Sequence, residues 1–431
     1  MFRALRGARL GLLREAPGFR LLFLATLASS IGTWLAVVAL VVDVYDRTQD
    51  AAWISALLIV EFLPLVVIGL LAGPLIDRLH RRSILIGADL ARAAVFFVLP
   101  FATGAFQIVL LALAAGFATS FFRPAQYAAL PNLVEDRDLP QANGLVQSAE
   151  NLTWMLGSLA GGALVAATSP DVAYVFNAVT FLLSALLIVR IRRSFEEQTA
   201  EPRPGGLREL REGLTLAVRS RALLTVLVAW SIVMLGNAGV NVAEIVLAKD
   251  VFSAGDFGYG ILLAAGGAGL VLGSVFGGGW IEQRGMRTPY AASIALMAVG
   301  YGLAAMSPNV WTAVPAVVLA GGGNGVAVIC NALLVQRGVA DRLRGRAFTV
   351  VMSLGYAVLG LGMIAAGPLT NALGARAVWA LSAGLFALAA AAGLALVRGL
   401  EESVARPPGD REEQISAPPP VRIEESGSRV G

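Results

Sequence analysis

Three glutamates within predominantly apolar stretches are the residues of this sequence best suited to chemistry: Glu61, Glu150 and Glu244. A carboxylate surrounded by hydrocarbon is costly and normally faces a cavity or a partner. Because desolvation favours the neutral form of a carboxyl, such a group can take up and release a proton. We predict that Glu61 and Glu150 carry a coupling proton, with Glu244 a third candidate nearer the outer end. The alternative is that each acid stays protonated and hydrogen-bonds between helices.

Neutral polar residues recur in the same stretches. They are predicted to face a central cavity that admits a small molecule, although each could instead form a hydrogen bond between two helices. The candidates are Gln147, Asn151, Asn177, Asn237, Asn241 and Asn331.

The composition requires lipid as the solvent. Of 431 residues, 57% are hydrophobic and 14% are charged, whereas about 25% are charged in soluble domains. The single cysteine, Cys330, and the single histidine, His80, leave no disulfide, His cluster or Cys-based metal site. No phosphate-binding Gly-x-x-x-x-Gly-Lys-Ser/Thr motif is present. We therefore expect that the protein is not an enzyme and binds no cofactor. We expect that an ion gradient supplies its energy.

Twelve stretches are candidates for membrane-spanning helices, each of about 20 mainly apolar residues. They are 21–43, 53–75, 84–104, 106–123, 142–167, 173–191, 222–248, 257–281, 288–306, 310–334, 346–371 and 376–397. Arginines concentrate in alternate connections, which places those connections and both termini in the cytoplasm. Because the basic residues alternate with spans and form no single patch, we do not expect a nucleic-acid partner.

The spans divide the chain into five parts. The predicted order is a cytoplasmic lead (1–20), a six-helix bundle (21–191), a cytoplasmic linker with an amphipathic helix (192–221), a second six-helix bundle (222–397) and a disordered cytoplasmic tail (398–431).

The second half of the sequence restates the first at a fixed offset. Residues 73–82 read GPLIDRLHRR, and residues 278–287 read GGWIEQRGMR, 205 positions later. Asp136-Arg137 corresponds in the same way to Asp341-Arg342, and Gly162 to Gly367. A sequence that repeats at one offset indicates a duplicated structure.

This combination resembles the major facilitator superfamily, and within it the drug, macrolide and siderophore exporters. The resemblance rests on the loop at 73–82, on GFRL at 18–21, on ADLARA at 88–93 and on DRLRGR at 341–346. Two positions depart from the family pattern: His80 replaces a glycine, and Ser158 replaces the proline of the span-five motif Gly-Pro-x-x-Gly-Gly.

The resemblance implies a conformational latch on the cytoplasmic side. Asp77 would face the start of span eleven and hold the two bundles together there while the other side is open. Asp89 and Arg92, one helical turn apart, can pair and join this network. The alternative is that the arginines only set the membrane topology. That role would require no aspartate or glycine at a fixed spacing. The predicted latch residues are Gly73, Asp77, Arg78, Arg81, Arg82, Asp89, Arg92, Arg344 and Arg346.

The glycines of span five, Gly157, Gly161 and Gly162, predict close approach of helix backbones. We therefore expect an all-α membrane protein with two pseudo-symmetric six-helix bundles, monomeric, in a bacterial inner membrane. The expected function is export of small amphiphilic molecules by alternating access and proton antiport, with protons and membrane lipids as the other partners. Two alternatives are a lipid or lysolipid flippase of the same fold and a membrane sensor or assembly factor that does not transport.

Overall fold

A computed structural model of the protein describes residues 11–71, 80–191, 220–339 and 344–397. Within these ranges the chain is helical and contains no strand. The amphipathic linker helix and the C-terminal tail expected from the sequence lie outside the described residues.

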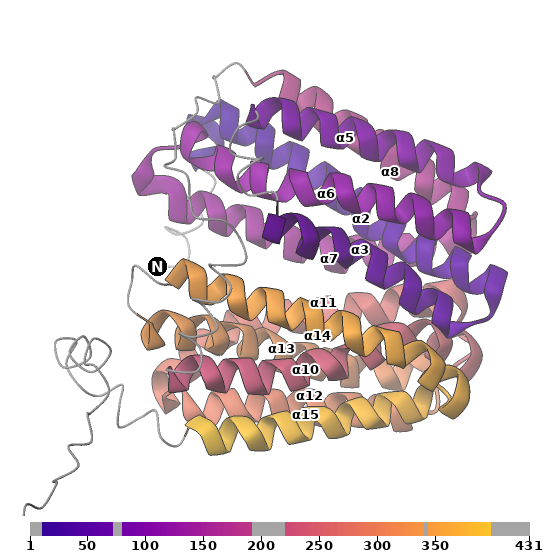
Figure 1. The fold of residues 1–431 in the computed structure, drawn as a ribbon, viewed down its shortest axis with the longest axis vertical. Coiled ribbons are helices and arrows are strands. Elements are labelled where there is room, and N and C mark those ends of the chain that lie inside the picture. Colours follow the sequence, from indigo (N-terminus) through magenta and orange to yellow (C-terminus); the bar gives the residue numbers. More distant parts are fainter. Residues whose placement is uncertain (1–10, 72–79, 192–219, 340–343, 398–431) are drawn as a thin grey trace, which may run out of the picture.

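Two groups of six long helices lie side by side (Figure 1). The N-terminal half contains α2 (Pro17–Thr48), α3 (Ala51–Leu71), α5 (Arg81–Val98), α6 (Ala105–Leu133), α7 (Leu139–Ala167) and α8 (Pro170–Val189). The C-terminal half contains α10 (Arg221–Val246), α11 (Gly255–Arg284), α12 (Arg287–Met306), α13 (Val310–Gly338), α14 (Arg344–Leu373) and α15 (Ala375–Val397). Short 3₁₀ segments lie at Leu99–Phe101 and Asp136–Asp138, and a π-helical segment, Leu247–Val251, follows α10.

The helices pack in the same pattern within each half. In the N-terminal half α2 packs on α7 and α8, α5 on α6 and α8, and α3 on α6. In the C-terminal half α10 packs on α14 and α15, α12 on α13 and α15, and α11 on α13. Each contact of one half thus has its counterpart in the other, as the sequence repeat predicts, and the all-α fold of two related bundles is confirmed.

Ten described helices are long and apolar enough to cross a membrane, and a shorter apolar helix covers Ala51–Glu61. The helix α7 is not among the ten. Its first half carries a series of polar side chains, which lower its hydropathy: Gln141, Asn143, Gln147, Ser148, Glu150 and Asn151. The protein is therefore a multi-pass membrane protein.

One predicted boundary was wrong. The fourth span was expected to end at residue 123, before Pro124, but α6 continues through Pro124 and Pro131 to Leu133. Proline is tolerated in a membrane helix because neighbouring helices and local adjustments of the backbone satisfy the freed carbonyls. This extension places Arg123 inside a helix.

The two halves touch near one end of the molecule, which we call the contact end. It carries the turn between α2 and α3, the turn between α10 and α11, and the last turn of α14. A Cβ atom built on Gly162 of α7 would lie 2.8 Å from the Cα atom of Gly260 in α11. One built on Gly367 of α14 would lie 2.6 Å from the hydroxyl oxygen of Ser55 in α3.

These two contacts are related by the repeat. Adding 205 to Gly162 gives Gly367, and adding the same offset to Ser55 gives Gly260. The pseudo-twofold axis therefore passes between the two contacts. At the opposite end the helices of the two halves diverge (Figure 1).

Candidate functional site

Two of the three predicted acids lie close to the boundary between the halves. Glu61 projects from α3 in the N-terminal half, and Glu244 from α10 in the C-terminal half. Tyr259 of α11 lies within electrostatic range of both carboxyls, and Tyr301 of α12 lies within range of Glu244. Glu244 is 5% exposed, and Glu61 is partly buried. Among the described residues, neither carboxyl has a cationic partner or a hydrogen bond.

In the part of the chain that the structure describes, nothing therefore neutralises either acid when it is ionised. An ionised carboxylate in such a place is costly, so protonation relieves the cost. Because the acids come from opposite halves, any movement of one half against the other changes their separation.

The third acid, Glu150 of α7, has a different environment. A terminal nitrogen of Arg123 lies 3.8 Å from a carboxylate oxygen of Glu150, and the Tyr127 hydroxyl hydrogen-bonds to the same side chain. The Glu150 side chain is 14% exposed, and that of Arg123 is 50% exposed. Glu150 therefore has a cationic neighbour, which Glu61 and Glu244 lack among the described residues.

Sequence reasoning did not identify Arg123 as a partner, because that residue was placed at the end of a span. Its position one turn before Tyr127, on a helix that continues to Leu133, was the signal available. The polar neighbours expected for Glu150 do lie nearby on α7, where the Gln147 amide donates to the Asn151 side chain at 3.3 Å.

Asp89 and Arg92 form a buried ion pair in α5, as their spacing predicts. Asp89 is fully buried and Arg92 is 5% exposed. The guanidinium carbon also lies 4.3 Å from the centre of the Phe122 ring and 4.2 Å from that of Phe181. Both rings belong to the N-terminal half, so this pair ties α5 to α6 and α8.

Replacing Arg92 with leucine should therefore destabilise the N-terminal half. Removing one partner of a buried ion pair leaves an unpaired charge and costs about 3–5 kcal/mol. The free energy of unfolding of the purified protein in detergent would measure this loss. Arg137→Leu is the control, since its side chain is 78% exposed beside Glu135 and should change stability by less than about 0.5 kcal/mol. Equal stability of the two variants would show that the Asp89–Arg92 pair has no structural role.

The remaining latch residues are only partly described. Gly73, Asp77 and Arg78 lie outside the described residues, and Arg344 and Arg346 lie in the first turn of α14, with their side chains undescribed. Arg81 donates to the carbonyl oxygen of Ala128 at 3.0 Å, and Arg82 donates to that of Val189. These bonds join α5 to α6 and α8 within the N-terminal half. The latch stays a prediction.

The neutral polar residues do not form one cluster. Asn177 is fully buried in α8, where its carbonyl and side-chain oxygens accept bonds from Thr180. Asn237 and Asn241 are partly buried on α10. Asn331 of α13 is 8% exposed, and no side-chain hydrogen bond to it is formed among the described residues.

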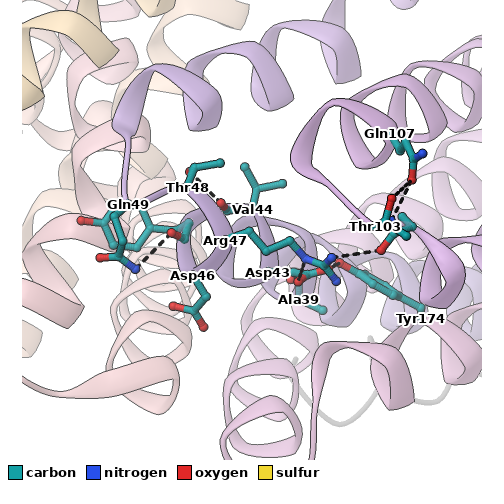
Figure 2. Close-up of polar contacts among 12 residues, drawn as sticks. Ala39, Asp43, Val44, Asp46, Arg47, Thr48, Gln49, Thr103, Gln107 and Tyr174 are labelled. Atoms are coloured by element: carbon teal, nitrogen blue, oxygen red, sulfur yellow. Dashed lines mark hydrogen bonds and ion pairs between the residues drawn. The ribbon is translucent and has the colours of Figure 1, made fainter.

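A network that the sequence did not suggest lies in the N-terminal half near the contact end (Figure 2). Arg47 pairs with Asp43 at 2.5 Å and donates to the carbonyl oxygen of Ala102 at 3.0 Å. The hydroxyl of Tyr174 donates to Asp43 at 3.0 Å. Asp43, one turn before Arg47, therefore joins α2 to α8 and to the turn before α6.

Solved structures share this fold across almost their full length. One is a bacterial homologue of the human lysosomal transporter Spinster, in an inward-facing and unoccupied conformation, with a TM-score of 0.73 and 13% identity. The structural match covers 90% of this chain and 98% of the Spinster homologue's chain. A second is the nucleoside transporter NupG, with a TM-score of 0.70, 15% identity and coverage of 88% and 98%. Two related six-helix bundles of this kind define the major facilitator fold.

Residues 12–420 match the transmembrane secretion effector family, and the chain belongs to that family of the major facilitator superfamily. Its relatives include the uncharacterised MFS-type transporter YfiS of Bacillus subtilis, 26% identical over 84% of this chain and 89% of the relative. The multidrug efflux pump Tap of Mycobacterium tuberculosis is 29% identical over 85% of this chain and 90% of the relative. The putative bacilysin exporter BacE of Bacillus subtilis is 26% identical over 69% and 75%. The protein is therefore a membrane transporter and not an enzyme.

Proposed function

We propose that this transporter exports small amphiphilic molecules in exchange for protons, by alternating access. The observation that carries the proposal is the placement of Glu61 and Glu244. They are acids of opposite halves, without a cationic partner in the described part of the chain, and Tyr259 lies within range of both. A pair of this kind can hold protons in one arrangement of the halves and lose them in another.

The contact end faces the outside of the cell in this proposal, so the structure is the state open toward the cytoplasm. Substrate enters between the diverging ends of the two halves and binds near the middle of the membrane, where the repeats of such folds meet. The halves then rock about the pseudo-twofold axis and the contact end opens. Protons from outside neutralise Glu61 and Glu244 as substrate leaves, and they are released inside after the halves return.

The substrate class rests on the relatives and on the lining residues. Tap is named as a multidrug efflux pump and BacE as a putative bacilysin exporter. In this chain Trp34 of α2 stacks on Trp154 of α7, with ring centres 5.4 Å apart. Flat aromatic rings suit amphiphilic molecules, and cationic ones above all. Gln147, Asn151, Asn177, Asn237, Asn241 and Asn331 are the proposed polar contacts of the cavity.

The flippase alternative shares the fold and predicts a different substrate. It requires that lysolipids compete with a fluorescent amphiphilic dye for transport by the protein. We further propose that the protein acts as a monomer in the inner membrane of a bacterium, with both termini in the cytoplasm.

Inverted membrane vesicles with an acidic interior test the proposal. Uptake of fluorescent amphiphilic dyes and macrolides should require the protein and should stop when the pH gradient is collapsed. Uptake that continues after collapse would exclude proton antiport. Absence of uptake for all dyes, together with transport of lysolipids, would favour the flippase.

Asp77→Asn tests the proposed latch. Without the carboxylate, the cytoplasmic ends of the halves lose the contact that holds them together in the outward-open state, so transport should fall while equilibrium binding of substrate changes little. Transport at the wild-type rate would contradict the latch.

A further inference from the structure

The contact end carries one ion pair and several hydrogen bonds that join the two halves, and Lys249 forms the ion pair. Lys249 is the only lysine of the sequence. Its ammonium lies 2.5 Å from a carboxylate oxygen of Asp46, in the N-terminal half, and 2.6 Å from one of Asp256, in its own half. The Lys249 side chain is 17% exposed, against 46% for Asp46 and 22% for Asp256.

Three further hydrogen bonds cross the boundary beside this cluster. The hydroxyl of Tyr45 donates to Asp250. The side chain of Asn371, at the end of α14, donates to Asp50 at 2.5 Å and accepts from the backbone N–H of Ala51 at 3.0 Å. The polar contacts therefore bind α2 and the start of α3 to the π-helical segment and to the end of α14.

Lys249 lies in an unusual stretch of backbone. Residues Leu247–Val251 form a π-helical turn, in which the N–H of Phe252 reaches the carbonyl of Leu247 at 2.9 Å. Such single turns cost more than regular helix and occur frequently at functional sites. Asp46 is also free for this contact, because it points away from the neighbouring Arg47–Asp43 pair (Figure 2).

The cluster is not a product of the repeat. Tyr45 and Asp250 are repeat equivalents of each other, which places their bond on the pseudo-twofold axis. The equivalents of Lys249 and Asp46, however, are Val44 and Val251. The ion pair thus exists in one copy at an otherwise symmetric contact, and packing of the repeated helices does not require it.

We propose that the Asp46–Lys249 ion pair is a lock across the two halves that sets how often the contact end opens. Lys249 holds Asp46 only while the halves are together, whereas its contact with Asp256 lies within one half and persists in both states. Loss of Asp46 or of the ammonium should therefore favour opening, and loss of Asp256 should not. This goes beyond the proposed function, since it holds for any substrate and any coupling ion.

Thiol labelling of the full-length protein tests the lock. Ser55 is 4% exposed beneath Gly367, so a cysteine at this position reacts with a water-soluble maleimide only when the contact end opens. In the Ser55→Cys background, Lys249→Gln and Asp46→Asn should each raise the labelling rate about tenfold, which corresponds to about 1.4 kcal/mol. Lys249→Arg should label like the parent, because it keeps the charge. The unaltered chain, with only the buried Cys330, is the blank.

Two comparisons make the result specific. Asp256→Asn should label within about twofold of the parent. The double variant Asp46→Asn with Lys249→Gln should label no faster than either single variant, because both remove the same interaction. Ser184→Cys, fully buried inside the N-terminal half, should stay unreactive in every variant, which separates opening from unfolding.

Labelling of Lys249→Gln within twofold of the parent, with Ser184→Cys protected, would overturn the proposal. So would an equal increase for Asp256→Asn and Asp46→Asn, since that result would assign the effect to packing within the C-terminal half. If Lys249→Gln makes the cysteine of Ser184→Cys reactive, the labelling rate of Asp46→Asn decides the test alone. The Asp46 side chain is 46% exposed, so its charge can be removed without leaving an unpaired charge in the interior.

Discussion

Glu244→Gln should abolish the substrate uptake that a pH gradient drives. It should retain the exchange of substrate across the membrane that occurs when no gradient is applied. Glutamine has nearly the size of a protonated glutamate but cannot release a proton, so the variant should bind and exchange substrate yet perform no net work. We expect gradient-driven uptake to fall by at least about tenfold, equivalent to about 1.4 kcal/mol. Uptake and exchange of one dye in reconstituted vesicles measure both activities.

Glu61→Gln should behave in the same way, because its carboxyl likewise has no cationic partner among the described residues. Glu150→Gln should reduce coupling less, since that carboxyl already has a cationic neighbour, with a terminal nitrogen of Arg123 3.8 Å away. Glu135→Gln, whose parent side chain is 72% exposed, is the control. A variant Glu244→Gln that still concentrates substrate when a gradient is applied would remove Glu244 from the proton path.

Gly162→Leu should prevent the contact end from closing. A Cβ atom at this position would lie 2.8 Å from the Cα atom of Gly260, well inside the optimal carbon–carbon separation of about 3.5–4.0 Å. Overpacking of this kind costs about 1–3 kcal/mol, which favours the open contact end by about 5- to 150-fold. Transport should fall accordingly, and a cysteine at Ser55 should label rapidly.

Gly367→Leu should have the same effect, because Gly367 is the repeat equivalent of Gly162 and faces α3 as closely. Gly144→Leu is the matched control on α7, since a Cβ atom there would have no neighbour within 4 Å. If Gly162→Leu transports at the rate of Gly144→Leu, the close contact between α7 and α11 has no part in the cycle.

The sequence predicted the fold well, because its signals are strong in a membrane protein. Apolar stretches of spanning length located each of the long helices, and the fixed offset between 73–82 and 278–287 predicted the duplication. The end of α6 was missed because Pro124 normally ends a helix in water, whereas neighbouring membrane helices stabilise the backbone around it.

The site was predicted less completely, for a different reason. Apolar surroundings mark Glu61, Glu150 and Glu244 as functional candidates, and the spacing of Asp89 and Arg92 predicted their pair. Whether an acid has a cationic partner depends on which helix packs against its face. That packing gave Arg123 to Glu150 and no cation to Glu244 among the described residues.

The sequence by itself determined that this is a duplicated all-α membrane protein with rare acids inside its spans, because local hydropathy and spacing are properties of the chain. Only the tertiary structure decided which of those acids are unpaired, and that Asp46 meets Lys249 across the two halves. The contact between Asp46 and Lys249 joins residues 203 positions apart in the sequence. Neither residue carries a local signal of its partner, since in the repeat their equivalents are valines.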